Sequence, residues 1–198
     1  MQQDFWDQRY EQDEMSYGAA PNDFLREVVK QLPRGAALCL GAGEGRNAVF
    51  LAEHLGPVTA VDQSPVGLAK AATLAESKNV GLKIAVADLR EFDFGEGWSV
   101  ITSIWAHVPP GVRARVHAEV LRSLAPGGAY VLEAYTPAQV GRGTGGPPDP
   151  SMNPTLEELR VQLEGLDFVI GRELEREVQE GAYHNGMSSV VQVLATKP

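Results

Sequence analysis

The chain has 198 residues, of which 43% are hydrophobic, and its formal net charge at pH 7 is −9. This length is enough for one well-buried domain and short for two, so we expect a single domain over residues 1–198. The acidic balance argues against a nucleic-acid partner, because affinity for a phosphate backbone comes largely from Lys and Arg.

The sequence carries no signal for export or for a membrane. Its single cysteine, Cys39, can form no internal disulfide, which fits a reducing compartment. No apolar run approaches the roughly 18 residues needed to span a bilayer, and the acidic segment 1–7 is unlike a signal peptide. We therefore expect a cytoplasmic protein without membrane contact.

Strand and helix patterns alternate along the first two thirds of the chain. Apolar runs predict strands over residues 36–40, 58–61, 82–87, 100–104 and 130–132. Helical spacing of apolar residues predicts helices over residues 21–32, 46–55, from 65 onward and 110–124. Strands that alternate with helices indicate a parallel sheet with helices on both faces.

The C-terminal part breaks this alternation. After a predicted helix over 155–163, two strands are predicted over 167–178 and 187–196. The dipeptide Asn185-Gly186 in the connection between them is typical of a hairpin turn. The last two strands are therefore expected to be antiparallel neighbours.

Alternate glycines follow the first strand, in Gly41-Ala42-Gly43-Glu44-Gly45, and the acid Asp62 follows the second. Parallel strands end side by side, so backbone can approach a ligand at the glycines while the acid accepts hydrogen bonds from both ribose hydroxyls. This pattern predicts a nucleoside cofactor site. The third glycine comes one residue earlier than in the dinucleotide fingerprint, and large side chains open the helix after it, which disfavours a pyrophosphate.

Motifs in the same order resemble those of the class I S-adenosylmethionine (SAM) methyltransferases, at residues 40–47, 62, 88–89 and 121–128. The Gly-Arg-Asn continuation at 45–47 and the closing strand 188–197 are most similar to the small tellurite-resistance (TehB-type) methyltransferases. The resemblance implies an α/β fold with a Rossmann-like, doubly wound, mostly parallel seven-stranded sheet of order 3-2-1-4-5-7-6. It also implies an antiparallel C-terminal hairpin, SAM as methyl donor and S-adenosylhomocysteine (SAH) as product. The implied acceptor is a small molecule, with an oxyanion or a thiol as candidates.

The resemblance assigns cofactor roles to residues at the strand ends. It implies that the glycine loop faces the amino-acid part of SAM, that Asp62 holds the ribose, and that Asp88 and the Leu89 backbone contact the adenine. It further implies that segment 103–105 borders the methionine part of SAM and the transferred methyl group, and that an N-terminal arm over residues 1–20 folds over SAM. The full predicted set is Tyr17, Gly41, Ala42, Gly43, Gly45, Arg46, Asn47, Asp62, Gln63, Asp88, Leu89, Ser103 and Trp105.

These candidates also have structural alternatives. An acid at a strand end, such as Asp62, can cap the next helix, and Trp105 or Tyr17 can be a packed aromatic anchor. His107 and His184 are the candidate catalytic residues: the first as an acceptor-facing base, the second by resemblance to a Gly-x-x-His segment of TehB-type enzymes. A backbone carbonyl can equally satisfy His107.

The sequence shows no metal-ligand cluster and no hydrolase triad, and methyl transfer needs neither, because the sulfonium of SAM is an activated leaving group. The Gly- and Pro-rich segment 140–154 is expected to be a flexible loop, either over the active site or as a surface connection. Two other interpretations stay open: an NAD-dependent oxidoreductase, which would lack the C-terminal hairpin, and a non-catalytic SAM-binding regulatory protein. The chain is expected to be a monomer or a homodimer.

Overall fold

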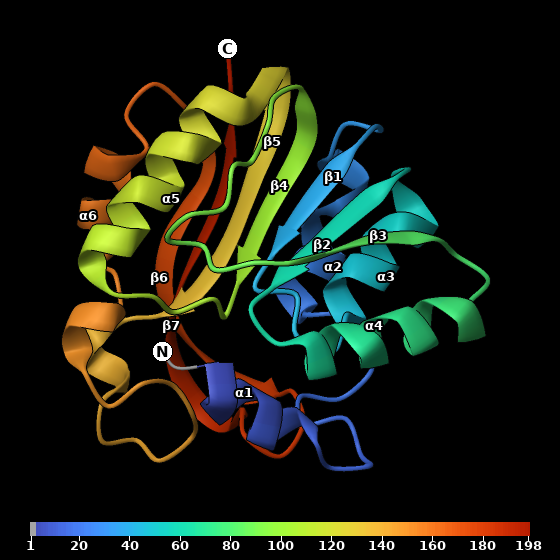
Figure 1. The fold of residues 1–198 in the computed structure, drawn as a ribbon. Coiled ribbons are helices and arrows are strands. Elements are labelled where there is room, and N and C mark those ends of the chain that lie inside the picture. Colours follow the sequence, from blue (N-terminus) through green and yellow to red (C-terminus); the bar gives the residue numbers. More distant parts are fainter. Residues whose placement is uncertain (1–2) are drawn as a thin grey trace.

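The computed structural model describes residues 3–198, and its centre is a seven-stranded sheet of order β3-β2-β1-β4-β5-β7-β6 (Figure 1). Neighbouring strands from β3 to β5 run parallel, whereas β7 pairs antiparallel with both β5 and β6. The predicted strand order and the antiparallel C-terminal hairpin are thereby confirmed. The strands are β1 (Ala37–Leu40), β2 (Val58–Asp62), β3 (Leu82–Val86), β4 (Trp98–Ile104), β5 (Leu124–Tyr135), β6 (Asp167–Gln179) and β7 (Asn185–Thr196).

Helices cover both faces of this sheet, as predicted. One buried apolar cluster joins α2 and α3 to one face, and a second joins α5 and α6 to the other. The α-helices are α1 (Gln3–Tyr10), α2 (Asp23–Val28), α3 (Arg46–His54), α4 (Pro65–Ser77), α5 (Pro110–Ser123) and α6 (Leu156–Gln162). Short 3-10 helices are η1 (Val29–Gln31), η2 (Pro137–Gln139) and η3 (Pro150–Met152). No helix among residues 3–198 has the length and apolar character to cross a bilayer.

Local signals set where these helices begin. Ser64 caps α4 by accepting the backbone N–H of Gly67 at 3.1 Å, and Pro65 occupies the first turn. Thr155 caps α6 in a reciprocal capping box with Glu158. Both starts fall where sequence reasoning expects them, because capping needs only neighbours in the chain.

The hairpin turn differs from the prediction. Asn185 and Gly186 are not the turn but the first residues of β7, where Asn185 pairs with Gln179. The connection is residues 180–184, closed by a 2.8 Å hydrogen bond from the Glu180 N–H to the His184 carbonyl. The tip of the hairpin contacts the N-terminal segment, where Ala182 donates its N–H to the Ser16 carbonyl. A turn dipeptide is a local signal and cannot predict a contact with a distant segment.

Strand β5 is much longer than the predicted strand over residues 130–132. β5 begins at Leu124, so the Pro-Gly-Gly at 126–128 lies inside the strand as an irregularity rather than before it. Strand β6 forms the edge of the sheet opposite β3 and pairs only with β7 among the described strands. Its exposed positions alternate, and they include Glu173, Glu175 and Glu177.

Candidate functional site

The glycine loop after β1 adopts a conformation that side chains disfavour. Gly41, Gly43 and Gly45 have φ angles of 60°, 52° and 89°, in the left-handed region where glycine is the usual residue. A Cβ on Gly41 would lie 2.8 Å from the Cβ of Ala106, and one on Gly45 would lie 2.4 Å from the Cβ of Ala71. The backbone of the glycine loop therefore packs directly against the segment after β4 and against helix α4, with no space for side chains at Gly41 and Gly45.

Asp62 lies against this loop at the carboxyl end of β2. One carboxylate oxygen accepts the N–H of Gly43 at 2.8 Å and the other accepts the N–H of Ser64 at 2.9 Å. Burial raises the pKa of Asp62, although these backbone hydrogen bonds act in the opposite direction. Gln63 follows, partly buried. The predicted pairing of the second glycine with the acid is thus present, and Ser64, not Asp62, caps α4.

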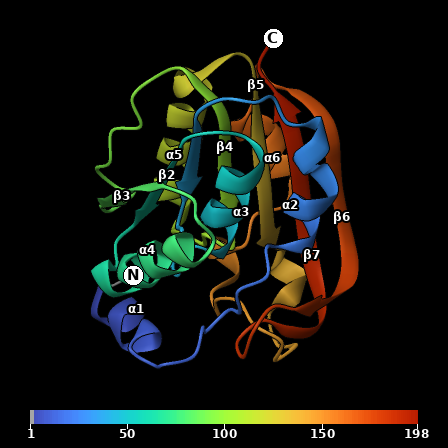
Figure 2. The ribbon, with the colours of Figure 1, turned by 90° about the vertical axis from the view of Figure 1, so that its right-hand side faces the viewer.

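An arm formed by residues 3–20 covers the glycine–acid pair, and Figure 2 shows it passing along the foot of the sheet from α1 toward α2. Tyr10, at the end of α1, is only 5% exposed. A Cβ built on Gly43 would meet the Tyr10 hydroxyl at 2.7 Å, and one on Gly67 would meet its ring at 2.8 Å. The tyrosine ring therefore fills the space directly above the second glycine, which the sequence did not single out.

Polar contacts fix the arm to α4 and to the glycine loop. Lys70 of α4 donates to the carboxylate of Glu44 at 2.9 Å, and Ser16 donates its N–H to the same carboxylate at 2.8 Å. The Ser64 hydroxyl donates to Asp7 at 2.5 Å. Side chains of the glycine loop and of α4 with its cap therefore hold the arm over the strand ends.

The arm also contacts the β6–β7 connection. The Arg9 guanidinium lies 3.7 Å from the ring centre of Tyr183 and donates to the Tyr17 hydroxyl at 3.1 Å. Ala182 donates its N–H to the carbonyl of Ser16 at 3.1 Å. Arm and hairpin tip therefore form one cover over the carboxyl edge of the sheet.

Beneath this cover lies an aromatic cluster of Tyr17, Trp105, Tyr135 and His184. Trp105 contacts Tyr135 with ring centres 4.5 Å apart and His184 at 5.0 Å, and Tyr17 contacts His184 at 4.7 Å. The structure thus brings three predicted residues together with Tyr135, which sequence reasoning missed. Trp105 has a φ of 57°, an unusual left-handed conformation for a bulky residue.

The glycine-rich loop of the 140–154 segment packs on the same cluster. A Cβ on Gly145 would lie 2.6 Å from the Tyr135 hydroxyl, and one on Gly146 would lie 2.6 Å from its ring. The Thr144 carbonyl accepts the N–H of Asn185 at 3.1 Å. Glycine is needed here because any side chain would meet Tyr135, so the composition of the loop reflects close packing.

The two candidate catalytic histidines have different surroundings. Both ring nitrogens of His107 are engaged, since Nε2 accepts the Tyr135 N–H at 3.0 Å and Nδ1 lies 3.2 Å from the Trp105 carbonyl. Burial lowers the pKa of His107 to about 4. Burial likewise lowers the pKa of His184 to about 3, but its buried Nδ1 has no partner within residues 3–198. His107 therefore matches its structural alternative, whereas His184 keeps an unpaired nitrogen.

Arg46 and Asn47 turn away from the glycine loop. Arg46 forms a buried ion pair with Glu180 of the hairpin tip, and Asn47 accepts the N–H of Asn22 at 2.9 Å. Both side chains are thus used in contacts within the protein. They fix the start of α3, which the glycine loop leads into.

The candidate adenine residues lie further along the strand ends. The side chain of Asp88 is 35% exposed and accepts from Arg90 at 2.6 Å; this hydrogen bond lowers its pKa. Leu89 and Ser103 line one small cavity beneath the segment after β4, together with His107. Asp88 therefore stands apart from the buried Asp62.

We expect His107 to make stability depend on pH. The unfolded chain protonates this imidazole near its ordinary pKa of 6.5, whereas the folded protein does so only near 4. Stability is therefore lost as the pH falls from about 6.5 toward 4, by about 2 kcal/mol between pH 7 and pH 5 for this one group. His107→Gln, which can form both hydrogen bonds without titrating, should reduce that difference in urea unfolding. An unchanged difference would mean that His107 is already charged in the fold.

Comparisons with known proteins agree with this geometry. A family model described as a methyltransferase domain matches residues 37–128. A 2-heptyl-1-hydroxyquinolin-4(1H)-one methyltransferase of Mycobacteroides abscessus is 26% identical over 148 residues, covering 73% of this chain. The chain spans only 65% of that relative's length.

Solved structures share the whole fold. TehB from Haemophilus influenzae superposes with a TM-score of 0.76 at 18% identity, covering 99% of this chain and 67% of TehB. The N-methyltransferase NodS from Bradyrhizobium japonicum WM9, in complex with SAH, gives a TM-score of 0.71 at 16% identity, covering 98% and 97%. The match to the methyltransferase-domain model spans β1 to β4 with the glycine loop, and the solved structures show that the chain has the fold of the class I SAM-dependent methyltransferases.

Proposed function

We propose that this chain transfers a methyl group from SAM to a small-molecule acceptor. The observation that carries the proposal is the contact between Asp62 and Gly43 at the ends of β2 and β1. A bare glycine loop lets the donor approach the backbone, and a carboxylate beside it can accept both ribose hydroxyls. These residues fit an adenosyl group. Gln63, Asp88 and Leu89 are the proposed contacts of its adenine.

SAM, when bound, supplies a methyl group on an activated sulfonium. The chain then has to hold the acceptor in line with that methyl group and exclude water. Closure of the arm, the hairpin tip and the 140–154 loop over the strand ends supports such a dry site. Trp105 and Ser103, at the end of β4, are the proposed neighbours of the methyl group.

His184 is the proposed contact for the acceptor. Its pKa of about 3 keeps the imidazole neutral at physiological pH. A neutral ring with an unpaired Nδ1 can accept a hydrogen bond from an acceptor hydroxyl or thiol and orient its lone pair. A role in orientation suits this nitrogen better than a role as a strong base.

The charges around the aromatic cluster bear on the acceptor class. Arg46 and Arg176 are both paired with carboxylates there, and Arg9 stacks on Tyr183. Cations that are already paired attract an inorganic oxyanion weakly. This favours a neutral acceptor such as a thiol or a ring hydroxyl, and the ring substrate named for the quinolone methyltransferase relative agrees with that choice.

The proposal is tested by calorimetric titration with SAM, SAH and NAD side by side. We expect binding of SAM and SAH and no response to NAD. Tight binding of NAD with silence toward the other two would instead support an oxidoreductase. SAM binding without SAH formation across a panel of thiol, hydroxyl and oxyanion acceptors would support a non-catalytic SAM-binding protein.

We also expect Tyr10→Ala to strengthen SAH binding by about tenfold. The tyrosine ring occupies the space above Gly43, so the arm has to withdraw a buried aromatic side chain before a nucleoside can enter; leaving such a ring in water costs about 1–3 kcal/mol. Calorimetry on wild type and variant measures the change. Phe5→Ala is the control, because Phe5 lies on the same helix and is 47% exposed. Weaker binding by Tyr10→Ala would make Tyr10 a wall of the donor site rather than an obstruction.

A further inference from the structure

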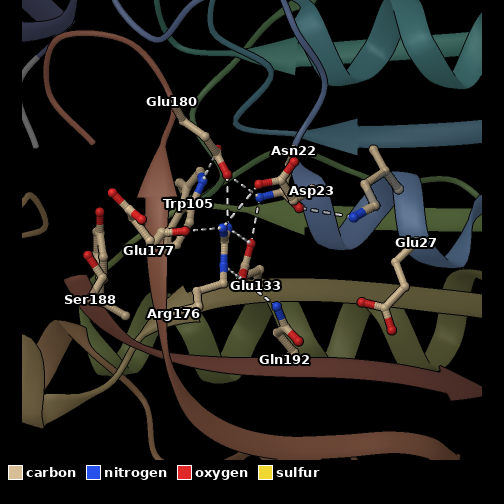
Figure 3. Close-up of polar contacts among 12 residues, drawn as sticks. Asn22, Asp23, Glu27, Trp105, Glu133, Arg176, Glu177, Glu180, Ser188 and Gln192 are labelled. Atoms are coloured by element: carbon tan, nitrogen blue, oxygen red, sulfur yellow. Dashed lines mark hydrogen bonds and ion pairs between the residues drawn. The ribbon is translucent and has the colours of Figure 1, made fainter. Parts of the chain in front are cut away.

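A buried network of charged side chains lies next to Trp105 of the aromatic cluster (Figure 3). It joins Arg46 of α3, Glu133 of β5, Arg176 of β6 and Glu180 of the hairpin connection. The side chains of Glu133 and Glu180 are 0% and 4% exposed, and those of the two arginines are 8% and 13% exposed. Equal numbers of both charges make the quartet neutral.

Glu180 is the member of this network that reaches the proposed site. Its carboxylate accepts the indole N–H of Trp105 at 2.7 Å, pairs with Arg46, and accepts from Arg176 at 2.9 Å. The side chain of Asn22, just after the arm, donates to it at 2.8 Å. Four segments that surround the proposed site therefore meet at one carboxylate.

Glu133 is chemically similar but differently connected. It accepts two hydrogen bonds from Arg176 at 2.8 Å each, one from Gln192 at 2.6 Å and one from Asn22 at 2.5 Å. The Glu133 carboxylate bonds to neither Trp105 nor Arg46 among the described residues; only the Glu133 backbone carbonyl reaches Trp105, accepting its N–H at 2.9 Å, and a side-chain substitution leaves that bond in place. The two glutamates thus form a natural pair of test and control positions.

Stability alone does not explain such a network. Buried ion pairs are often no more stabilising than apolar side chains of the same volume, because removing both charges from water costs as much as their attraction returns. Trp105 adds a second unfavourable feature, its left-handed φ of 57°, of a kind that persists where surrounding contacts enforce it and that clusters at functional sites.

The conformation of Trp105 has a direct geometric result. It turns the chain so that Ala106 lies against Gly41, where an added Cβ would come within 2.8 Å of the alanine Cβ. It also directs the indole toward Tyr135 and His184. The end of β4 is thereby fixed against the glycine loop on one side and against the aromatic cluster on the other.

We propose that Glu180 is a positioning residue that holds Trp105 and Arg46, and so couples the acceptor side of the site to the donor loop. The proposal rests on the methyl-transfer function proposed above. Glu180 itself touches neither donor nor acceptor in this assignment. It acts by holding the indole through its N–H and the start of α3 through the guanidinium.

The test compares Glu180→Gln with Glu133→Gln. Each removes one buried negative charge from the network, so both should lower the melting temperature. Only Glu180→Gln changes the group that accepts the Trp105 indole N–H and pairs with Arg46. Its amide N–H cannot accept from the indole or from a guanidinium, which forces the side chain to rotate. We expect about fivefold weaker SAH binding by calorimetry for Glu180→Gln, within the range for mutations that modulate a site without contacting its ligand, and no change for Glu133→Gln.

A second measurement follows Trp105 directly and does not depend on a ligand. In a chain carrying Trp6→Phe and Trp98→Phe, the remaining indole should change its emission maximum and lose anisotropy with Glu180→Gln but not with Glu133→Gln. Trp105→Phe keeps an aromatic ring but removes the indole N–H that Glu180 accepts, so adding Glu180→Gln to it should weaken SAH binding by less than it does in the wild type. If Glu180→Gln folds poorly, Trp105→Phe alone still tests the contact, because it leaves the charged network intact and should weaken SAH binding.

The outcomes separate the two proposals. If Glu180→Gln and Glu133→Gln have the same effect on Trp105 emission and on SAH affinity, Glu180 is only structural and the positioning role is wrong. If the wild-type chain binds no SAH, the proposed methyl transfer is wrong. The fluorescence measurement still decides whether Glu180 holds Trp105. If the losses of SAH affinity caused by Glu180→Gln and Trp105→Phe add fully in the double variant, the proposed coupling between the two residues is also wrong.

Discussion

Asp62→Ala is expected to weaken SAH binding by about 10- to 100-fold, the effect of losing hydrogen bonds to a charged group worth about 1.5–3 kcal/mol. Asp62 is 8% exposed at the end of β2, and its carboxylate accepts the N–H of Gly43 in the glycine loop after β1. Calorimetric titration with SAH measures the loss.

The same substitution is expected to lower the stability of the fold by about 2 kcal/mol. Asp62 accepts the N–H groups of Gly43 and Ser64, and alanine leaves both buried donors without a partner. Titration therefore has to be done where urea unfolding shows the variant to be folded. Asp93→Ala is the control acid, because its side chain is 85% exposed. Full SAH affinity in folded Asp62→Ala would mean that the ribose is held elsewhere.

Arg176→Met is expected to destabilise the protein by about 3–5 kcal/mol, the usual cost of removing one partner from a buried charge pair. Arg176 donates to both Glu133 and Glu180, so its loss leaves the fully buried carboxylate of Glu133 without a cation. Urea unfolding at pH 7 measures the change. Substitution of an apolar side chain for the arginine preserves volume, which isolates the effect of the unpaired charge.

A second change should reverse part of that loss. Adding Glu133→Gln to Arg176→Met removes the stranded charge, so the double variant should be more stable than Arg176→Met alone. Arg90→Met is the control, because the Arg90 side chain is 62% exposed where it pairs with Asp88, and its loss should cost less than about 1 kcal/mol. Equal losses for Arg90→Met and Arg176→Met would contradict the assigned role of burial.

Much of the sheet could be predicted because its signals are local. Apolar runs of the right length locate β1 to β4, and the Ser64-Pro65 cap locates α4 within the chain itself. The contact of Gly43 with Asp62 follows from topology, because parallel strands β1 and β2 end at the same edge. The position of the antiparallel hairpin next to β5 came from family resemblance, which local patterns could not supply.

The missed features all depend on contacts between distant segments. Glu133 is a charged residue inside an apolar run, and this was the one available sign of a buried partner. That partner, Arg176, stands in a strand where Arg and Glu alternate, so the sequence does not reveal which arginine faces inward. Tyr10 lies in a polar helix with a weak apolar face, and its burial depends on the glycines that it covers.

The outer edge of the sheet has a consequence for solubility. Along β6 the exposed face carries carboxylates at every second position, at Glu173, Glu175 and Glu177. If a second copy paired its own β6 with this unpaired strand edge, carboxylates of the two chains would come together on one face of the extended sheet. Native sheets use charged side chains on edge strands in this way to prevent edge-to-edge aggregation. Repulsion between carboxylates therefore opposes pairing of two copies through β6, while Glu175 is in addition paired with Arg142 of the same chain.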